Sequence, residues 1–153
     1  MKHLTFWFDV ISPYAYLAFE RLPQALEGLS YSVEYRPILF AGLLSHWGQK
    51  GPAEIAPKRD WTYRQVKWIA DQNGIALQAP AHHPFNPLPL LRLVLAAGAN
   101  RHTVEAAFHH VWRGGGDASD AARWLALQAQ LKPARDPSSA EIKESLRAHT
   151  QAA

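Results

Sequence analysis

The amino-acid sequence predicts an α/β fold in a single domain, opening with a strand–helix–strand unit and continuing into a long helical region. Three observations predict it: an aromatic, β-favouring first segment, a Ser-Pro helix start directly after it, and an alternating segment typical of a second strand. The length of 153 residues is that of one domain. With 48% hydrophobic and 19% charged residues, the chain can bury a sizeable core.

Residues 3–9 form the first predicted strand. Apolar side chains fall on both of its faces, which indicates an inner strand covered on both sides. Serine is a favoured N-cap and proline suits the first helical position, so Ser12 and Pro13 start a helix. This helix continues over residues 14–27 and ends at Gly28, with a kink or break expected at Pro23.

Residues 31–36 alternate apolar and polar side chains, which is the period of a half-buried strand. Together the two strands and the helix make a right-handed βαβ unit in residues 1–40. Helices dominate the following residues 41–135, with Gly- and Pro-rich loops at 47–57 and 80–89. The helices are predicted at 58–73, 88–97, 103–113 and 119–131, and a last one begins with a capping box at 138–141.

Composition excludes several classes of function. A chain without cysteine cannot form disulfides, thiolate metal sites or a dithiol redox pair. The net charge of +3 comes from scattered basic residues, so nucleic-acid binding is not expected. No apolar run is long enough for a membrane span and no signal peptide is visible, which predicts a cytoplasmic protein. His82 and His83 lie in a loop, and His109 and His110 are adjacent on a helix, so the latter two cannot both face one ion. No carboxylate or third histidine stands at ligand spacing, so no metal site is expected.

Ser12 is the residue whose chemistry stands out. Unpaired amides and the helix dipole favour an anion at a helix N-terminus, and a serine hydroxyl can donate one hydrogen bond to it. If the anion is the thiolate of a bound thiol, stabilisation of roughly 1–3 kcal/mol lowers the thiol pKa by about one to two units. The alternative is a purely structural N-cap. A serine nucleophile is not supported, because no glycine–serine elbow or general base accompanies Ser12.

Residues 8–18, Phe-Asp-Val-Ile-Ser-Pro-Tyr-Ala-Tyr-Leu-Ala, resemble the opening motif of 2-hydroxychromene-2-carboxylate isomerases and kappa-class glutathione transferases. These are thioredoxin-like proteins of the DsbA/kappa type. Ser12 and Ala15 stand where redox relatives carry a Cys-x-x-Cys pair. Weaker similarities extend the resemblance over the whole chain, at residues 36–39, 42–44, 48–52, 58–63, 84–88 and 115–120.

This resemblance implies a thioredoxin-like fold with a large helical insertion, in which residues 136–153 begin the C-terminal thioredoxin half. It implies glutathione as cofactor, a small aromatic carboxylate as substrate, and a homodimer. Ser12 is the implied catalytic residue. The implied cofactor-binding residues are Ser12, Pro13, Gln49 and Lys58, and the implied substrate-binding residues are Lys58, His83, Phe85 and Asn86.

The implied function is the glutathione-dependent isomerisation of an aromatic hydroxy-carboxylate. Two alternatives stay open: a kappa-like glutathione transferase, and a non-catalytic protein that binds a thiol peptide or a partner. The sequence departs from the family pattern in two places. Gln49 replaces an asparagine, and the C-terminal ββα unit with its Val-Pro element is missing, so we expect a truncated chain.

Overall fold

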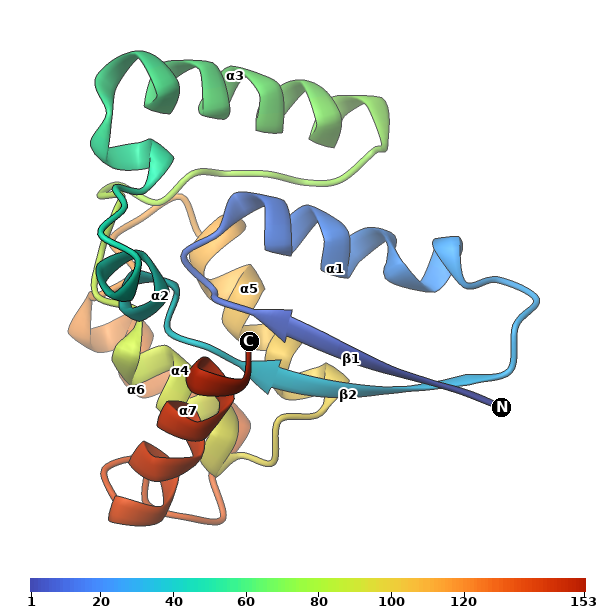
Figure 1. Ribbon diagram of the computed structural model, residues 1–153, viewed down its shortest axis with the longest axis vertical. Coiled ribbons are helices and arrows are strands. Elements are labelled where there is room, and N and C mark those ends of the chain that lie inside the picture. Colours follow the sequence, from blue (N-terminus) through green and yellow to red (C-terminus); the bar gives the residue numbers. More distant parts are fainter.

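The computed structural model describes residues 1–153 as a small sheet surrounded by helices (Figure 1). The predicted strand–helix–strand opening and the helical region after it are confirmed. The elements are β1 (Lys2–Phe8), α1 (Pro13–Ala25), β2 (Tyr31–Pro37), α2 (Phe40–His46), the short 3-10 helix η1 (Pro52–Glu54), α3 (Ala56–Gln72), α4 (Leu88–Ala96), α5 (Arg101–Trp112), α6 (Ala121–Leu131) and α7 (Ala140–Ala152).

The two strands are parallel and pair with each other along their full length. One face of this sheet carries Phe6 and Phe8 toward α1 and α5, where their ring centroids lie 6.3 Å from Phe19 and 5.4 Å from Phe108. Such aromatic pairs bury large apolar areas and favour tilted ring arrangements. This face of the sheet therefore forms part of the main core.

The opposite face of the sheet is not covered by a second layer, so the expectation that β1 is buried on both faces is wrong. His3 and Thr5 are exposed there, and Trp7 is only half-buried. The guanidinium of Arg36 lies 5.1 Å from the Trp7 ring centroid, and the His149 ring lies 6.2 Å from it. These two polar side chains shield the indole in place of an apolar layer.

Helix α1 passes through Pro23 and ends at Ala25, two residues later. The expected break at Pro23 is therefore wrong, although the helix stops before residue 27, where we expected its end. A proline in the last turn removes only one of the final helical hydrogen bonds, which a helix tolerates better than a loss in its middle. Gly28 has a φ of 79° in the turn to β2, a conformation that glycine adopts without strain.

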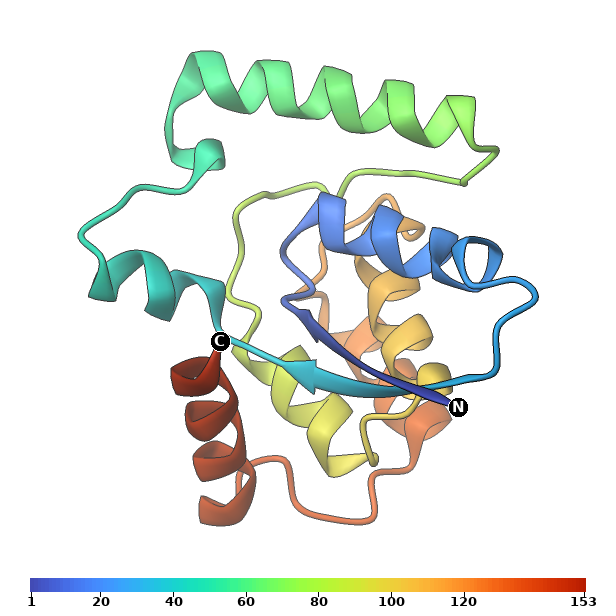
Figure 2. The ribbon, with the colours of Figure 1, turned by 45° about the vertical axis from the view of Figure 1, so that its right-hand side comes forward.

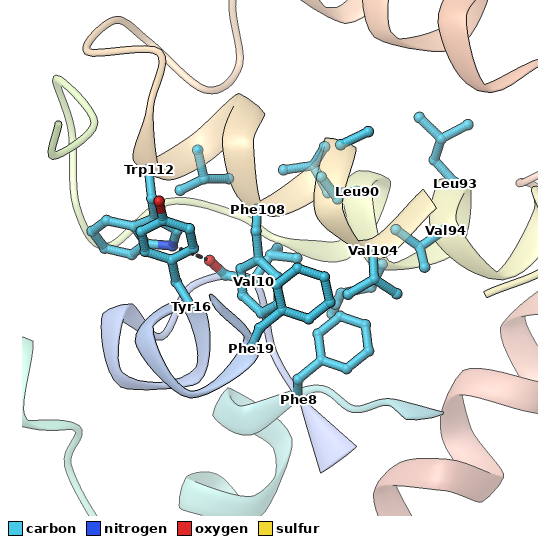
Figure 3. Packing of buried hydrophobic residues seen from close by; sticks show 14 of the residues in the cluster. Phe8, Val10, Tyr16, Phe19, Leu90, Leu93, Val94, Val104, Phe108 and Trp112 are labelled. Atoms are coloured by element: carbon cyan, nitrogen blue, oxygen red, sulfur yellow. Dashed lines mark hydrogen bonds between the residues drawn. The ribbon is translucent and has the colours of Figure 1, made fainter. Parts of the chain in front are cut away.

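The hydrophobic core is one cluster of 25 buried residues (Figure 3). Helix α4 is its most apolar element, with six of nine residues buried, and packs against α7, α5 and β2. Helix α3 contributes only Val66 and Ala70 to this core, and α1 lies between it and the sheet (Figures 1 and 2). None of the helices combines the length and the apolar character that crossing a lipid bilayer requires.

Helix α7 is capped differently from our prediction. The Ser139 hydroxyl accepts the Ile142 amide as N-cap, while Glu141 pairs with Arg135 at 2.8 Å instead of closing a capping box. At the other end of α7, the Thr150 hydroxyl accepts a hydrogen bond from the Leu39 amide at 2.9 Å. The C-terminal helix thereby supports the connection between β2 and α2.

Candidate functional site

The turn between β1 and α1 is organised by Asp9, the first residue after the strand. Its Oδ1 accepts a hydrogen bond from the Ile11 amide (3.0 Å), and its Oδ2 accepts one from the Phe40 amide at the start of α2 (2.9 Å). The Ser12 amide donates to the Asp9 carbonyl oxygen (3.1 Å). Burial raises the pKa of the Asp9 carboxyl to about 6, against the opposing effect of the two amides. Asp9 therefore joins the Ser12 turn to α2.

The carbonyl groups of the same turn are held by two side chains from distant segments. The Trp112 indole Nε1 donates to the Val10 carbonyl oxygen at 2.9 Å, the bond drawn dashed in Figure 3. His83 Nε2 lies 2.7 Å from the Ile11 carbonyl oxygen, and its ring packs against Trp112 with centroids 5.4 Å apart. Because amides and carbonyls are both engaged, the turn that presents Ser12 has little conformational freedom.

The hydrogen bonds of His83 determine its tautomer. A carbonyl oxygen can only accept, so Nε2 carries the hydrogen that reaches Ile11. Nδ1 is then the acceptor for the Tyr63 hydroxyl of α3, 2.6 Å away. Burial lowers the pKa of His83, which favours this neutral ring at pH 7. Because neither ring nitrogen is free, His83 positions the turn and is not placed to take a proton from a ligand.

The tip of α1 presents two hydrogen-bond donors. The Ser12 hydroxyl oxygen accepts the Ala15 amide at 3.2 Å, which confirms Ser12 as N-cap, and its hydrogen remains free to donate. Pro13 has no N–H, and the Tyr14 amide has no acceptor within the protein. An anion at this tip would therefore meet the Ser12 O–H and the Tyr14 N–H, together with the positive end of the helix dipole.

A cleft of about 440 Å³ opens in front of this tip, a volume within the usual range for small-molecule sites. Its walls come from the β1–α1 turn, α2, η1, α3 and the segment before α4. The residues lining it are Asp9, Ile11, Ser12, Pro13, Tyr14, Phe40, Ala41, Leu44, Ser45, Gln49, Gly51, Pro52, Ala53, Glu54, Thr62, His83, Pro84, Phe85 and Pro87.

Five of the seven predicted site residues lie together in this cleft: Ser12, Pro13, Gln49, His83 and Phe85. The structure does not bring the other two to its wall. Asn86 is exposed, and its side-chain oxygen accepts the amide of Leu88, the first residue of α4, at 3.1 Å. Lys58 is exposed in the first turn of α3, four residues before Thr62, which does line the cleft. Lys58 therefore shares a helix face with a lining residue without lining the cleft itself.

Sequence reasoning missed Asp9, Tyr14, Phe40, Glu54 and Thr62 as lining residues. Only Asp9 left a usable signal, because an acidic side chain directly after an apolar strand has to find donors when it is buried. Glu54 lies in a Gly- and Pro-rich loop whose course the local pattern does not fix. Tyr14 and Thr62 lie on helices, where polar or aromatic side chains are equally typical of exposed positions.

The paired histidines have separate partners. His109 Nε2 contacts Glu20 at 2.8 Å, whereas His110 Nε2 donates to the Ala118 carbonyl oxygen at 2.8 Å. The two neighbouring rings point to different partners, as expected for adjacent helical positions. In the other pair, His82 is exposed and His83 belongs to the Ser12 turn described above.

The parallel βαβ unit, the helix tip that carries Ser12 after its first strand and the helical insertion define a thioredoxin-like protein that has no cysteine at this tip. Comparison with known families agrees. The DSBA-like thioredoxin domain matches residues 3–153, and the chain belongs to this family. The resemblance identified from the sequence and the predicted fold class are thereby confirmed.

Curated relatives include enzymes of both predicted branches. The chain is 31% identical to a 2-hydroxychromene-2-carboxylate isomerase of Sphingobium xenophagum, over 78% of this chain and 63% of that protein. It is 31% identical to glutathione S-transferase kappa 2 of Caenorhabditis elegans, over 52% of this chain and 36% of that protein. The chain thus spans from about a third to just under two thirds of the length of these relatives.

Solved structures agree on the fold. A 2-hydroxychromene-2-carboxylate isomerase superposes with a TM-score of 0.81 and 23% identity, covering 97% of this chain and 78% of that one. The cytosolic disulfide reductase DsbM from Pseudomonas aeruginosa gives a TM-score of 0.66 and 19% identity, covering 98% and 75%. At these identities the structural similarity concerns the fold.

Proposed function

We propose that this chain is a glutathione-dependent isomerase of an aromatic hydroxy-carboxylate, similar to 2-hydroxychromene-2-carboxylate isomerase. The observation that carries the proposal is the α1 tip, where the Ser12 hydroxyl and the Tyr14 amide are unengaged donors at the wall of a ligand-sized cleft. The chain has no sulfur nucleophile of its own, since it lacks cysteine. A thiol supplied by a bound cofactor fits these donors.

The α1 tip would act by stabilising a thiolate. Hydrogen bonds to a charged acceptor and the helix dipole together contribute roughly 1–3 kcal/mol. This lowers the pKa of a cysteine-like thiol from about 8.5 toward neutrality. When bound, glutathione would supply a thiolate that adds to the conjugated double bond and leaves again after rotation. Ser12 and Tyr14 would hold the sulfur anion, and the rigid turn around them would keep these two donors in place.

The remaining predicted residues divide between the cleft and its surroundings. Gln49 would hydrogen-bond the cofactor, and Phe85 would pack against the aromatic substrate. Lys58, on the same helix face as Thr62, would pair with a carboxylate at the mouth of the cleft. His83 would contribute indirectly, because both of its ring nitrogens hold the protein together.

Substitution of Ser12 tests the proposal. Ser12→Ala removes the hydroxyl donor and also the N-cap, which costs the helix about 1 kcal/mol. Ser12→Asp keeps an N-cap but brings a negative charge without a donor, and Ser12→Thr keeps both cap and hydroxyl. We expect the rate of 2-hydroxychromene-2-carboxylate isomerisation to fall by about tenfold or more in the alanine and aspartate variants. The threonine variant should have a rate close to that of wild type.

The pKa of bound glutathione, followed by the ultraviolet absorbance of the thiolate, gives a second readout. In wild type it should lie about one to two units below the value for free glutathione, and in the Asp variant this shift should vanish. Full turnover in both the Ala and the Asp variant would refute the role of Ser12. The homodimer that the family resemblance implies and the predicted cytoplasmic location belong to the same proposal.

A kappa-like glutathione transferase is the second candidate, favoured by the match to the kappa 2 enzyme. The two activities differ in what happens to the cofactor. Isomerisation leaves the total of free glutathione unchanged, whereas conjugation to an electrophile consumes one molecule per turnover. Quantifying free glutathione during turnover of 2-hydroxychromene-2-carboxylate and of a halogenated aromatic electrophile separates them.

A further inference from the structure

The side chains that line the cleft include negatively charged groups but no positively charged ones. Asp9 and Glu54 are carboxylates, no lysine or arginine lines the wall, and His83 is held in its neutral tautomer by Tyr63 and Ile11. In contrast to these carboxylates, the positive end of the helix dipole at the tip of α1 favours a negatively charged ligand group. A ligand that fills this cleft therefore meets a site for an anion at Ser12 and an acidic wall elsewhere.

The two carboxylates differ in their availability. Asp9 is 3% exposed, and each of its oxygens already accepts a backbone amide, so it is less available to a ligand in the cleft than Glu54. Glu54 is exposed, and only its Oε2 has a partner, the Gly51 amide at 2.6 Å. No lysine, arginine or histidine forms an ion pair with it.

The bond to Gly51 fixes Glu54 at the cleft. Leu44 and the Glu54 carboxylate already lie 3.2 and 3.3 Å from the position that a Cβ of residue 51 would occupy, so the glycine allows a close approach. Both Gly51 and Leu44 line the cleft with Glu54. The carboxylate is therefore held by one oxygen while the other remains available.

We propose that Glu54 accepts the ammonium group of the thiol ligand through its free Oε1, which makes the cleft selective for thiols that carry a positive charge remote from the sulfur. The inference rests on the proposed function and deepens it. In glutathione the ammonium of the γ-glutamyl residue has this chemistry. The thiolate would lie at Ser12 and the ammonium at Glu54, so both ends of the ligand meet opposite charge.

The test compares two thiols that differ only in the ammonium group: glutathione and glutaryl-cysteinyl-glycine, in which a hydrogen replaces it. Isothermal titration measures both with wild type and Glu54→Gln. The glutamine oxygen can still accept the Gly51 amide, so the local fold is kept. Glu27→Gln, at an exposed glutamate outside the cleft, makes the same change in net charge and serves as the matched control.

We expect wild type and the Glu27 variant to bind glutathione about three- to tenfold more tightly than the analogue, a range that allows for solvent around Glu54. In Glu54→Gln the preference should disappear through weaker binding of glutathione alone. If Glu54→Gln binds glutathione and keeps the full preference, the inference is overturned while the proposed function stands. If wild type binds neither thiol, the proposed function itself fails and the inference with it.

Discussion

Asp9 is a carboxyl group that the fold buries without a positively charged partner. Its two hydrogen bonds come from the Ile11 and Phe40 amides, and no lysine, arginine or histidine forms an ion pair with it. Desolvation outweighs these bonds and raises the pKa of Asp9 to about 6. The ionised form is therefore less favourable in the folded protein than in the unfolded chain, where the ordinary value is 3.8.

This shift makes stability depend on pH. A raised pKa means that the folded protein binds a proton that the unfolded chain does not, so the stabilisation is complete below about pH 4 and is lost as the pH rises through about 6. Its size is on the order of 3 kcal/mol. Urea unfolding of wild type and Asp9→Asn across this range measures it. The free energy of unfolding of wild type should rise relative to the variant as the pH falls.

A constant difference between the two proteins from about pH 4 to pH 8 would contradict this explanation. Asparagine removes the titration but also replaces one acceptor oxygen by a donor, so one of the two amides loses its partner. The variant should therefore be less stable at the low end of the range, where the hydroxyl oxygen of protonated Asp9 can still accept an amide hydrogen bond and the asparagine NH2 group cannot.

At the scale of single residues, the sequence predicts what local chemistry decides. Ser12 could be predicted as an N-cap because a Ser-Pro pair directly after a strand is typical of a helix start. Its capping bond is also local, since it spans three residues. The bonds of Asp9 to Phe40 and of His83 to Ile11 span 31 and 72 residues. Such pairings depend on how elements pack, and no local pattern contains that information.

Helix α7 supports the cleft without lining it. Thr150 near its end accepts the Leu39 amide, and the Thr150 methyl group lies 3.6 Å from the position of a Cβ on Gly42 in α2. Helix α2 contributes Phe40 and Leu44 to the cleft wall. The attachment of α7 therefore bears on the shape of the cleft.

The attachment of α7 depends on two buried side chains, Ile142 and Leu146. Ile142 is fully buried, so Ile142→Ala should lower the free energy of unfolding by about 2–5 kcal/mol, against about 0.5–1.5 for Ile142→Val. Chemical denaturation of the three proteins measures the series. A loss below about 1 kcal/mol for the alanine variant would mean that α7 contributes little to the folded state.

The elements themselves were largely predictable because apolar periodicity and capping residues act locally. Their exact ends were not. Of two neighbouring serines, Ser139 caps α7, whereas the Ser138 hydroxyl donates to Asp136 and Glu141 pairs with Arg135. Pro23 was tolerated because α1 ends within the next turn. Both outcomes depend on neighbours that a helix pattern does not include.

Over the whole molecule, burial is distributed unevenly. Seven of the twelve residues of α5 are buried, but only two of the seventeen in α3. Helix α3 is attached to the body through Val66 and Ala70. Two hydrogen bonds add to this attachment: Tyr63 donates to His83, and the Tyr14 hydroxyl donates to the Gln65 side-chain oxygen. Since α3 contributes Thr62 to the cleft, one wall of the site belongs to a weakly buried helix.

This distribution predicts a gradient of local stability. Helices with few buried side chains open at lower free energy than the core, so α3 amides should exchange hydrogen well before those of α5. Hydrogen–deuterium exchange read by mass spectrometry on peptides from the two helices measures the difference. Equal protection of α3 and α5 would show that α3 opens only when the whole molecule unfolds.

The layering of the molecule was the part of the fold that the sequence described least well. Trp7 gives β1 an apolar residue on each face, yet its partners are Arg36 and His149 and not a packed layer. A tryptophan can be shielded by the stems and rings of polar side chains, and hydropathy alone does not distinguish this from a true interior position.

Ser12 at the helix tip has a consequence for oxidation under the proposed function. The chain contains no cysteine, and its one methionine is the exposed Met1, so no protein sulfur lies where the reaction would occur. Peroxide would therefore act on this enzyme through the supply of reduced thiol in solution, and not by modifying the polypeptide. Exchange into fresh reduced thiol would restore the full rate at once, with no repair enzyme.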